Sequence, residues 1–141
     1  MFGKTYEDRL QEWAAFRESL EDSEDPFRDL IAFYRQAPSV SIHTDPFNQD
    51  AWPTAWELLL ENQYCDFCRV LGYYYSLQLT ERFKGSTFEI HISTDNALGY
   101  MYLLFVDNQV LGYDERICMD TYRGSLSIKG NKIPKRIFRI F

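Results

Sequence analysis

Apolar positions in the first part of the chain recur at helical spacing. Over residues 5–21 they fall every three or four residues, which predicts a helix with one apolar face. Thr5 precedes this stretch and Asp8 follows three residues later, a weaker form of the capping box that opens many helices. Asp25 followed by a proline is a second helix start, and we expect a short helix from there to about Gln36. The N-terminal region is thus predicted to contain two helices.

A third helical pattern begins after a segment rich in tryptophan and proline. Thr54 and Glu57 fit a capping box, so a helix is expected to start at Trp56 or just before it. The pattern continues to about Phe83, with a weak point near Asn62. In its second half apolar residues occupy most sides, and a helix that is apolar on most sides is buried on most sides. We therefore predict one long central helix.

From Ser86 onwards the apolar period changes to two, which is the spacing of a strand. The segment "TFEIHI" alternates, "YMYLLFV" is almost continuously apolar, and "QVLGY" returns after an Asp-Asn turn. These segments predict a three-stranded antiparallel meander, and "IPKRIFRIF" is expected to add a short terminal strand. Because helices precede strands, the order predicts an α+β fold. In it, N-terminal helices and one long central helix pack on a three- to four-stranded antiparallel sheet.

The 141 residues have the length of a single domain. We see no internal repeat or linker that would divide it. Four segments are expected within this domain: N-terminal helices and an extended segment (1–43), a Trp-Pro loop with the central helix (44–84), the antiparallel meander (86–114) and a basic tail (123–141).

Charge and cysteine content narrow the expected partners. The net charge is −6, although the chain from Arg123 onwards has six bases and no acid. Domains that bind phosphate are usually basic overall, so nucleic acid is not an expected partner. A membrane is not expected either, because no apolar run approaches the roughly 20 residues that span a bilayer, and the N-terminus lacks the apolar core of a signal peptide. Three cysteines cannot form a complete set of disulfides, which favours reduced thiols in a cytoplasm.

Two of the cysteines form a Cys-x-x-Cys pair. Cys65 and Cys68 would share one face of a helix, and with His91 and Cys118 they would supply the three cysteines and one histidine that zinc accepts. The second ligand pair that structural zinc sites usually present on a turn is missing, however, and free cysteine is among the most buried residue types. We therefore interpret the pair as core cysteines and expect no metal. The isolated glycines offer no phosphate-binding loop, so no cofactor is expected.

A cysteine nucleophile is the enzymatic alternative. The chain order of Cys65, His91 and then Asp95 or Asp114 is similar to that of transglutaminase-like and papain-like hydrolases. Two features oppose this hypothesis. Cys65 is predicted in the middle of a helix unless the chain breaks near Asn62, and only a thiol near a helix N-terminus has its pKa lowered by the helix. His91 is predicted on the exposed, polar side of its strand, pointing away from the cysteine.

Aromatic residues make up 17% of the chain, a share that suggests contacts beyond its own core. Phe47, Trp52 and Trp56 are expected to cluster and hold the Trp-Pro loop against the helix, with Phe47 and Trp52 as candidate anchors for a partner protein. The end of the tail is the second candidate. A strand that is apolar on both faces needs cover, so we predict contact with a partner subunit through Ile137, Phe138, Arg139, Ile140 and Phe141.

Three segments carry a resemblance to a known group of proteins. The segments "DPFNQDAWPTAWELLLENQYCDF", "LQLTERFKGSTFEIHISTD" and "YLLFVDNQVLGYD" resemble small uncharacterised proteins of contractile-tailed phages that infect cyanobacteria. The likeness covers about residues 44–114, and "DAWPTAWELL" and "LTERFKGS" are its most distinctive pieces. The group contributes no enzymatic motif to residues of this chain.

The resemblance implies a phage protein that is made in the host cytoplasm and located in the virion. We expect a structural or assembly protein of the tail or baseplate that contacts other phage structural proteins, in multiple copies, and is not an enzyme. Two alternatives stay open: the cysteine hydrolase described above, and an early host-directed binding protein.

Overall fold

The computed structural model describes residues 1–40, 44–95, 99–112, 115–117 and 131–133. Within these ranges the chain forms four α-helices followed by an antiparallel sheet, so the predicted α+β class is confirmed. Cys118, Asp114 and the tail residues 134–141 lie outside the described residues, as does part of the predicted extended segment.

The two N-terminal helices begin where the capping pattern predicts. Helix α1 (Tyr6–Leu20) starts after Thr5, whose side chain accepts a hydrogen bond from the Asp8 amide. Helix α2 (Pro26–Tyr34) starts after Asp25, which caps it in the same way. Apolar residues of both helices pack in one common core. The two helices end close to the predicted positions.

The central helical segment differs from the prediction. It is two helices, α3 (Ala55–Glu61) and α4 (Asp66–Gln78), preceded by a short 3-10 turn η1 (Gln49–Ala51). Asn62 ends α3 in the left-handed conformation with φ 55° and ψ 40°, a conformation that asparagine tolerates better than most residues. Backbone bonds with the segment after α2 then hold the break open, because the Tyr64 amide donates to the Pro38 carbonyl at 2.9 Å and the Tyr64 carbonyl accepts from the Val40 amide at 3.2 Å.

The predicted meander is confirmed and forms the centre of a larger sheet. The described strands follow the order β4-β3-β2-β1-β5, and the paired neighbours are antiparallel. Asp107, with φ 52°, lies in the tight turn between the second and third strands. The bounds are β1 (Phe88–Asp95), β2 (Gly99–Val106), β3 (Gln109–Leu111), β4 (Arg116–Ile117) and β5 (Asn131–Ile133).

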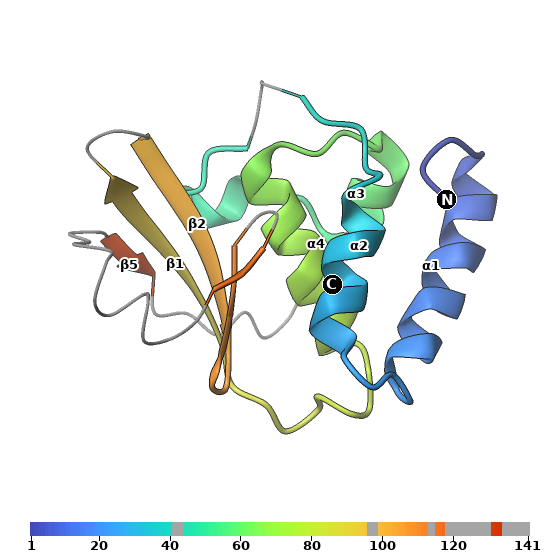
Figure 1. The fold of residues 1–141 in the computed structure, drawn as a ribbon. Helices are drawn as coiled ribbons and strands as arrows, with labels where there is room; N and C mark the ends of the chain where they lie inside the picture. The colour runs from blue at the N-terminus through green and yellow to red at the C-terminus, as the bar shows by residue number, and fades with distance from the viewer. Residues whose placement is uncertain (41–43, 96–98, 113–114, 118–130, 134–141) are drawn as a thin grey trace.

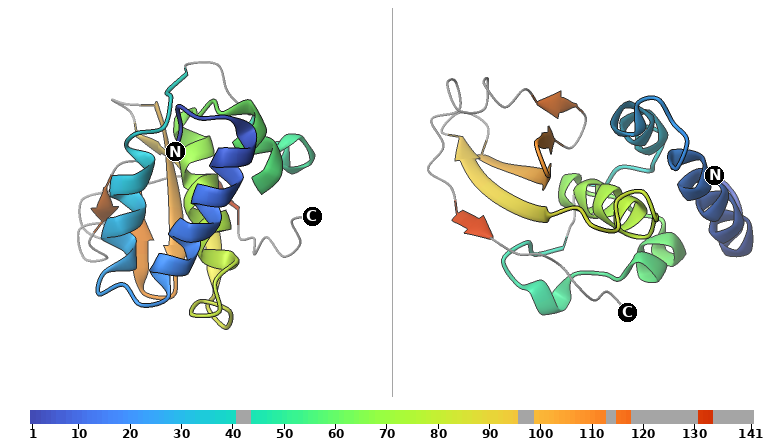
Figure 2. Two further views of the ribbon diagram at one scale, coloured as in Figure 1. Left: turned by 90° about the vertical axis from the view of Figure 1, so that its right-hand side faces the viewer. Right: turned by 90° about the horizontal axis from the view of Figure 1, so that it is seen from below.

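Helix α4 lies between the sheet and the other three helices (Figures 1 and 2). It is buried on most sides, as the sequence predicts, and it contacts β2 as well as α1, α2 and α3. One face of β1 and β2 contributes Ile90 and Leu104 to this core. Every helix in the described part of the chain is therefore organised around α4, whose N-terminus meets the Trp-Pro segment.

Candidate functional site

The Trp-Pro block, residues 46–56, is fixed to the body of the protein. The Trp52 indole donates to the Pro46 carbonyl at 3.2 Å, and its ring packs edge-on against Phe67 of α4 at 5.0 Å. The Tyr75 hydroxyl, also on α4, donates to the Pro53 carbonyl at 2.5 Å. Trp52 is thus buried within its own chain, whereas Phe47 is 47% exposed. Of the two predicted anchors in this block, only Phe47 lies on the surface.

Helix α3, which begins at the end of the Trp-Pro block, presents an apolar surface. Trp56 is 38% exposed and Leu60 is 58% exposed, and with Phe47 they are the exposed large hydrophobic side chains of the described residues. Trp56 and Leu60 are four positions apart and therefore lie on one side of the helix. We call this pair the α3 face. The Trp56 ring also packs edge-on against Trp13 of α1 at 5.6 Å, which fixes its orientation.

Two polar side chains hold α3 at its C-terminal end. Arg9 of α1 donates to the carbonyls of Leu59 and Leu60, at 2.8 Å and 3.2 Å. The Asn62 amide donates to the Phe2 carbonyl at 2.7 Å. Carbonyls in the last turn of a helix have no partner within the helix, so Arg9 satisfies groups that would otherwise need water.

The break between α3 and α4 places the cysteines differently from the sequence prediction. Cys65 is the residue immediately before α4, with φ −77° and ψ 173°, and not a mid-helix residue. Its sulfur accepts a hydrogen bond from the Cys68 amide at 3.4 Å. The Thr44 hydroxyl lies 3.5 Å from the Cys68 sulfur. Both cysteines are buried and free of disulfides, as expected for core residues.

The two thiols are electrostatically unequal. A hydrogen bond with the Cys68 side chain is the largest cause of a lowered pKa at Cys65. Burial raises this pKa, whereas the backbone amides of Cys68, Thr44 and Phe67 lower it further. Together they lower the pKa of Cys65 to about 6. The same hydrogen bond, with burial, raises the pKa of Cys68. This inequality depends on the break before α4, which the continuous apolar pattern of the sequence does not reveal.

His91 is not the exposed strand histidine that the alternation predicted. Its side chain is buried, stacks on the Phe105 ring at a centroid distance of 4.0 Å, and lies 2.9 Å from a Glu89 carboxylate oxygen. Its neighbour Ile90 belongs to the helix-facing core. Since successive strand residues point to opposite faces, His91 lies on the other face of the sheet from α4 and Cys65. The alternation assigned the correct face but not the burial.

The hydrolase constellation is therefore not assembled among the described residues. Cys65 and His91 are separated by the sheet, Asp114 lies outside the described ranges, and Asp95 is described only as the last residue of β1. The described residues also contain no group of three or more His, Cys, Asp and Glu side chains placed to hold a metal ion. No helix in this part of the chain is long and apolar enough to cross a membrane.

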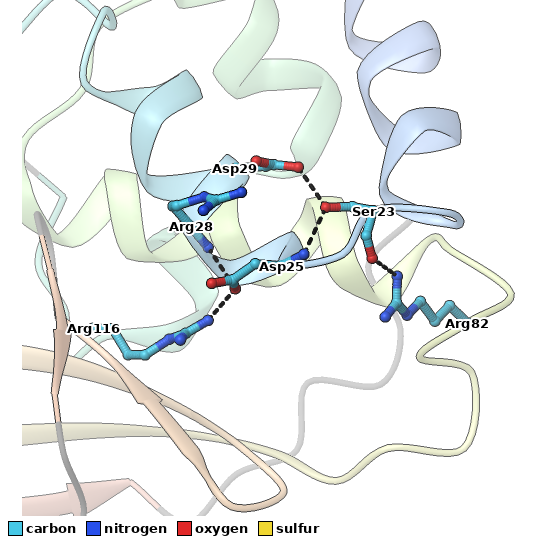
Figure 3. Close-up of polar contacts among 6 residues, drawn as sticks. All are labelled: Ser23, Asp25, Arg28, Asp29, Arg82 and Arg116. Atoms are coloured by element: carbon cyan, nitrogen blue, oxygen red, sulfur yellow. Dashed lines mark hydrogen bonds and ion pairs between the residues drawn. The ribbon is translucent and has the colours of Figure 1, made fainter.

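A groove of about 570 Å³ lies at the start of α2, between that helix, residues 82–86 and the sheet. Asp25 accepts from the Arg28 amide and pairs with Arg116 of β4 (Figure 3). Although partial burial opposes it, this pairing with the Arg28 amide and the Arg116 guanidinium lowers the pKa of Asp25. Arg82 donates to the carbonyls of Leu20 and Ser23 at 2.9 Å and 2.8 Å.

These groove contacts connect segments that are distant in the sequence. Both arginines are already bonded within the chain: Arg116 connects the start of α2 to β4, and Arg82 connects the segment after α4 to the loop between α1 and α2. Asp25 and Arg116 are 91 positions apart, and no local sequence signal relates them. The cluster is therefore not predictable from short-range sequence patterns.

Comparison with known proteins adds no relative. The chain matches no protein-family model, and it shows no significant similarity to a curated protein or to a solved structure. Burial, contacts and charge of its own residues therefore define the candidate interaction surface.

Proposed function

We propose that this protein is a structural or assembly component of a tailed-phage virion, located in the tail or baseplate, and that it acts through protein-protein contacts. The observation that carries the proposal is the α3 face. A tryptophan and a leucine on adjacent turns of one helix are exposed, while the large apolar residues around them are buried. Tryptophan is enriched among the residues that dominate binding energy in interfaces.

The α3 face is held rigidly before any partner binds. The Thr54 and Glu57 capping box fixes the start of the helix, with hydrogen bonds of 3.2 Å and 2.8 Å. Arg9 and Asn62 fix its end. A surface that is ordered in advance loses little conformational entropy on binding, which favours a stable contact.

Charge around the α3 face indicates the kind of partner. Glu57 and Glu61 are exposed and follow Trp56 and Leu60 directly in the sequence. Opposite charges at an interface rim steer association and disfavour wrong partners. The proposed partner is therefore another virion protein with an apolar pocket that accepts Trp56 and Leu60 and with lysine or arginine at its rim.

The virion setting is supported by the resemblance of residues 44–114 to proteins of contractile-tailed phages. The segments that carry this resemblance include the Trp-Pro block and α3. An acidic chain also suits contact with proteins better than contact with nucleic acid, since most nucleic-acid-binding domains are basic.

Quantitative mass spectrometry of purified particles tests the proposal. The chain is expected in intact virions at a constant ratio to the tail proteins, and the ratio should survive a high-salt wash that removes loosely bound material. Abundant protein in the infected cell that is absent from washed particles would contradict the proposal and favour the host-directed alternative.

A further inference from the structure

The thiol pair at the start of α4 forms a cluster that the proposed interaction does not use. Cys65 caps the helix and Cys68 lies in its first turn, with the Cys68 amide 3.4 Å from the Cys65 sulfur. The Thr44 hydroxyl lies 3.5 Å from the Cys68 sulfur. Cys65 and Cys68 are three positions apart at the start of α4, so their side chains lie on the same side of its first turn.

We propose that Cys65 and Cys68 form a reversible dithiol-disulfide centre whose oxidising substrate is a small peroxide. The Cys65 thiolate attacks one peroxide oxygen, the O–O bond breaks, and with one proton taken up the products are a Cys65 sulfenic acid and water. The Cys68 thiol then attacks the Cys65 sulfur, forming the disulfide and releasing a second water. In sum, two thiols and hydrogen peroxide give one disulfide and two waters. A dithiol reductant reverses the change and becomes a disulfide itself.

The division of roles follows from the surroundings of each sulfur. The Cys65 sulfur accepts a hydrogen bond from the Cys68 amide at the N-terminus of α4, and its interaction with Cys68 and with backbone amides lowers its pKa to about 6. The thiolate is the reactive form of cysteine. Cys68 has its pKa raised by donating to Cys65 and by burial, so it keeps its proton until Cys65 has been oxidised. Cys65 is therefore the attacking residue and Cys68 the resolving residue.

Burial of the pair selects the size of the oxidant. Cys65 is 5% exposed and Cys68 is 4% exposed. Thr44 lies against the Cys68 sulfur and the Trp-Pro block packs on the neighbouring Phe67. A peroxide of two heavy atoms needs far less room than an aromatic or peptide disulfide. We therefore expect hydrogen peroxide to react faster than a bulky aromatic disulfide reagent of equal intrinsic reactivity.

The test uses the full chain with Cys118→Ser, so that the third cysteine cannot contribute. The folded protein is treated with stoichiometric hydrogen peroxide and analysed by intact mass and by mapping of linked peptides. The expected product lacks two hydrogens and contains a Cys65–Cys68 disulfide that dithiothreitol removes. The rate should fall about tenfold for each pH unit below about pH 6, as thiolate is lost. Adding Cys68→Ser should leave a Cys65 sulfenic acid that dimedone traps, whereas adding Cys65→Ser should abolish both products.

Circular dichroism and thermal melting establish whether each variant is folded. If the double variants do not fold, disulfide formation and its pH dependence in the Cys118→Ser protein still test the proposal. Disulfide formation only in urea, or modification of Cys68 in preference to Cys65 in the folded chain, would overturn the proposal. So would a rate whose pH midpoint is that of an ordinary thiol, near 8.5.

Discussion

The phenol ring of Tyr34 on α2 lies so close to Gly72 on α4 that a β-carbon at Gly72 would stand 2.7 Å from the ring. The Tyr34 hydroxyl is 3.1 Å from the Ser76 hydroxyl, which also accepts a hydrogen bond from the Trp13 indole at 2.9 Å. A buried polar cluster thus ties α1, α2 and α4 together, and the missing side chain at Gly72 makes room for it. The orientation of the helices depends on this contact.

Gly72→Ala should destabilise the protein. Alanine favours a helix over glycine by up to about 1 kcal/mol, but overpacking a filled core costs typically about 1–3 kcal/mol, and the Tyr34 ring is fixed on several sides by other aromatic rings. We expect a lower urea midpoint with an unchanged slope. Gly85→Ala is the matched control, because nothing lies within 4 Å of a β-carbon there. A Gly72→Ala protein as stable as the parent would show that α2 and α4 are less closely packed.

Thr54→Ala should cost about 0.5–2 kcal/mol of stability, the usual effect of losing a helix N-cap. The variant removes the acceptor for the Glu57 amide. The bond from the Thr54 amide to the Glu57 carboxylate does not need the hydroxyl and is expected to remain. Thr54→Ser, which keeps the hydroxyl, should restore most of the loss. Melting temperatures that do not distinguish alanine from serine would mean that the cap contributes nothing to the fold.

Alkaline pH should weaken the fold through Tyr34. Burial is the main cause that raises its pKa from 10.0 to about 12, and burial also raises the pKa values of Tyr64 and Tyr74. Between about pH 10 and pH 12 the unfolded tyrosine loses its proton while the folded one keeps it. The unfolded state then binds fewer protons, so the free energy of unfolding falls as pH rises. Below pH 10 this contribution is fully present.

For Tyr34 alone the loss by about pH 12 is roughly 2 kcal/mol. Urea unfolding at a series of alkaline pH values measures it, with Tyr34→Phe as the comparison. The phenylalanine variant should lose less stability over this range than the parent. Parallel curves for the two proteins would show that Tyr34 does not titrate differently on folding.

Local sequence signals predicted much of the fold. Thr5, Asp25 and Thr54 each cap the helix that the pattern assigned to them, because capping depends on residues only three positions away. The strand alternation likewise predicted the meander and the face on which Ile90 lies. These features depend on short-range geometry, which the residue types express directly.

Features that depend on distant segments were not predictable in the same way. The break before α4 is held by backbone bonds between Tyr64 and the segment at Pro38, and the pattern of apolar residues continues across it. The inequality of Cys65 and Cys68 follows from that break. His91 was assigned to solvent because it alternates with isoleucines, yet it stacks on Phe105 of the neighbouring strand. Of the predicted interaction residues, Trp52 is buried, Phe47 is exposed and the tail lies outside the described residues.

Leu60→Asp tests the α3 face with little risk to the fold. Leu60 is 58% exposed, and surface substitutions of this kind usually change stability by no more than about 0.5 kcal/mol. Trp56 is less suitable because its ring also packs on Trp13. Lys84→Asp is the matched control, because it introduces the same side chain at a position that is 79% exposed and outside the helices.

The most direct measurement is the amount of each variant incorporated into particles when it competes with the parent chain in the same infection. Docking of the variant would bury an unpaired carboxylate in an apolar pocket, which costs about 2 kcal/mol or more, so Leu60→Asp should be depleted in virions by roughly thirtyfold relative to the parent, with Lys84→Asp unaffected. Equal incorporation of Leu60→Asp and the parent would contradict the assignment of the α3 face as the surface that binds this protein into the virion.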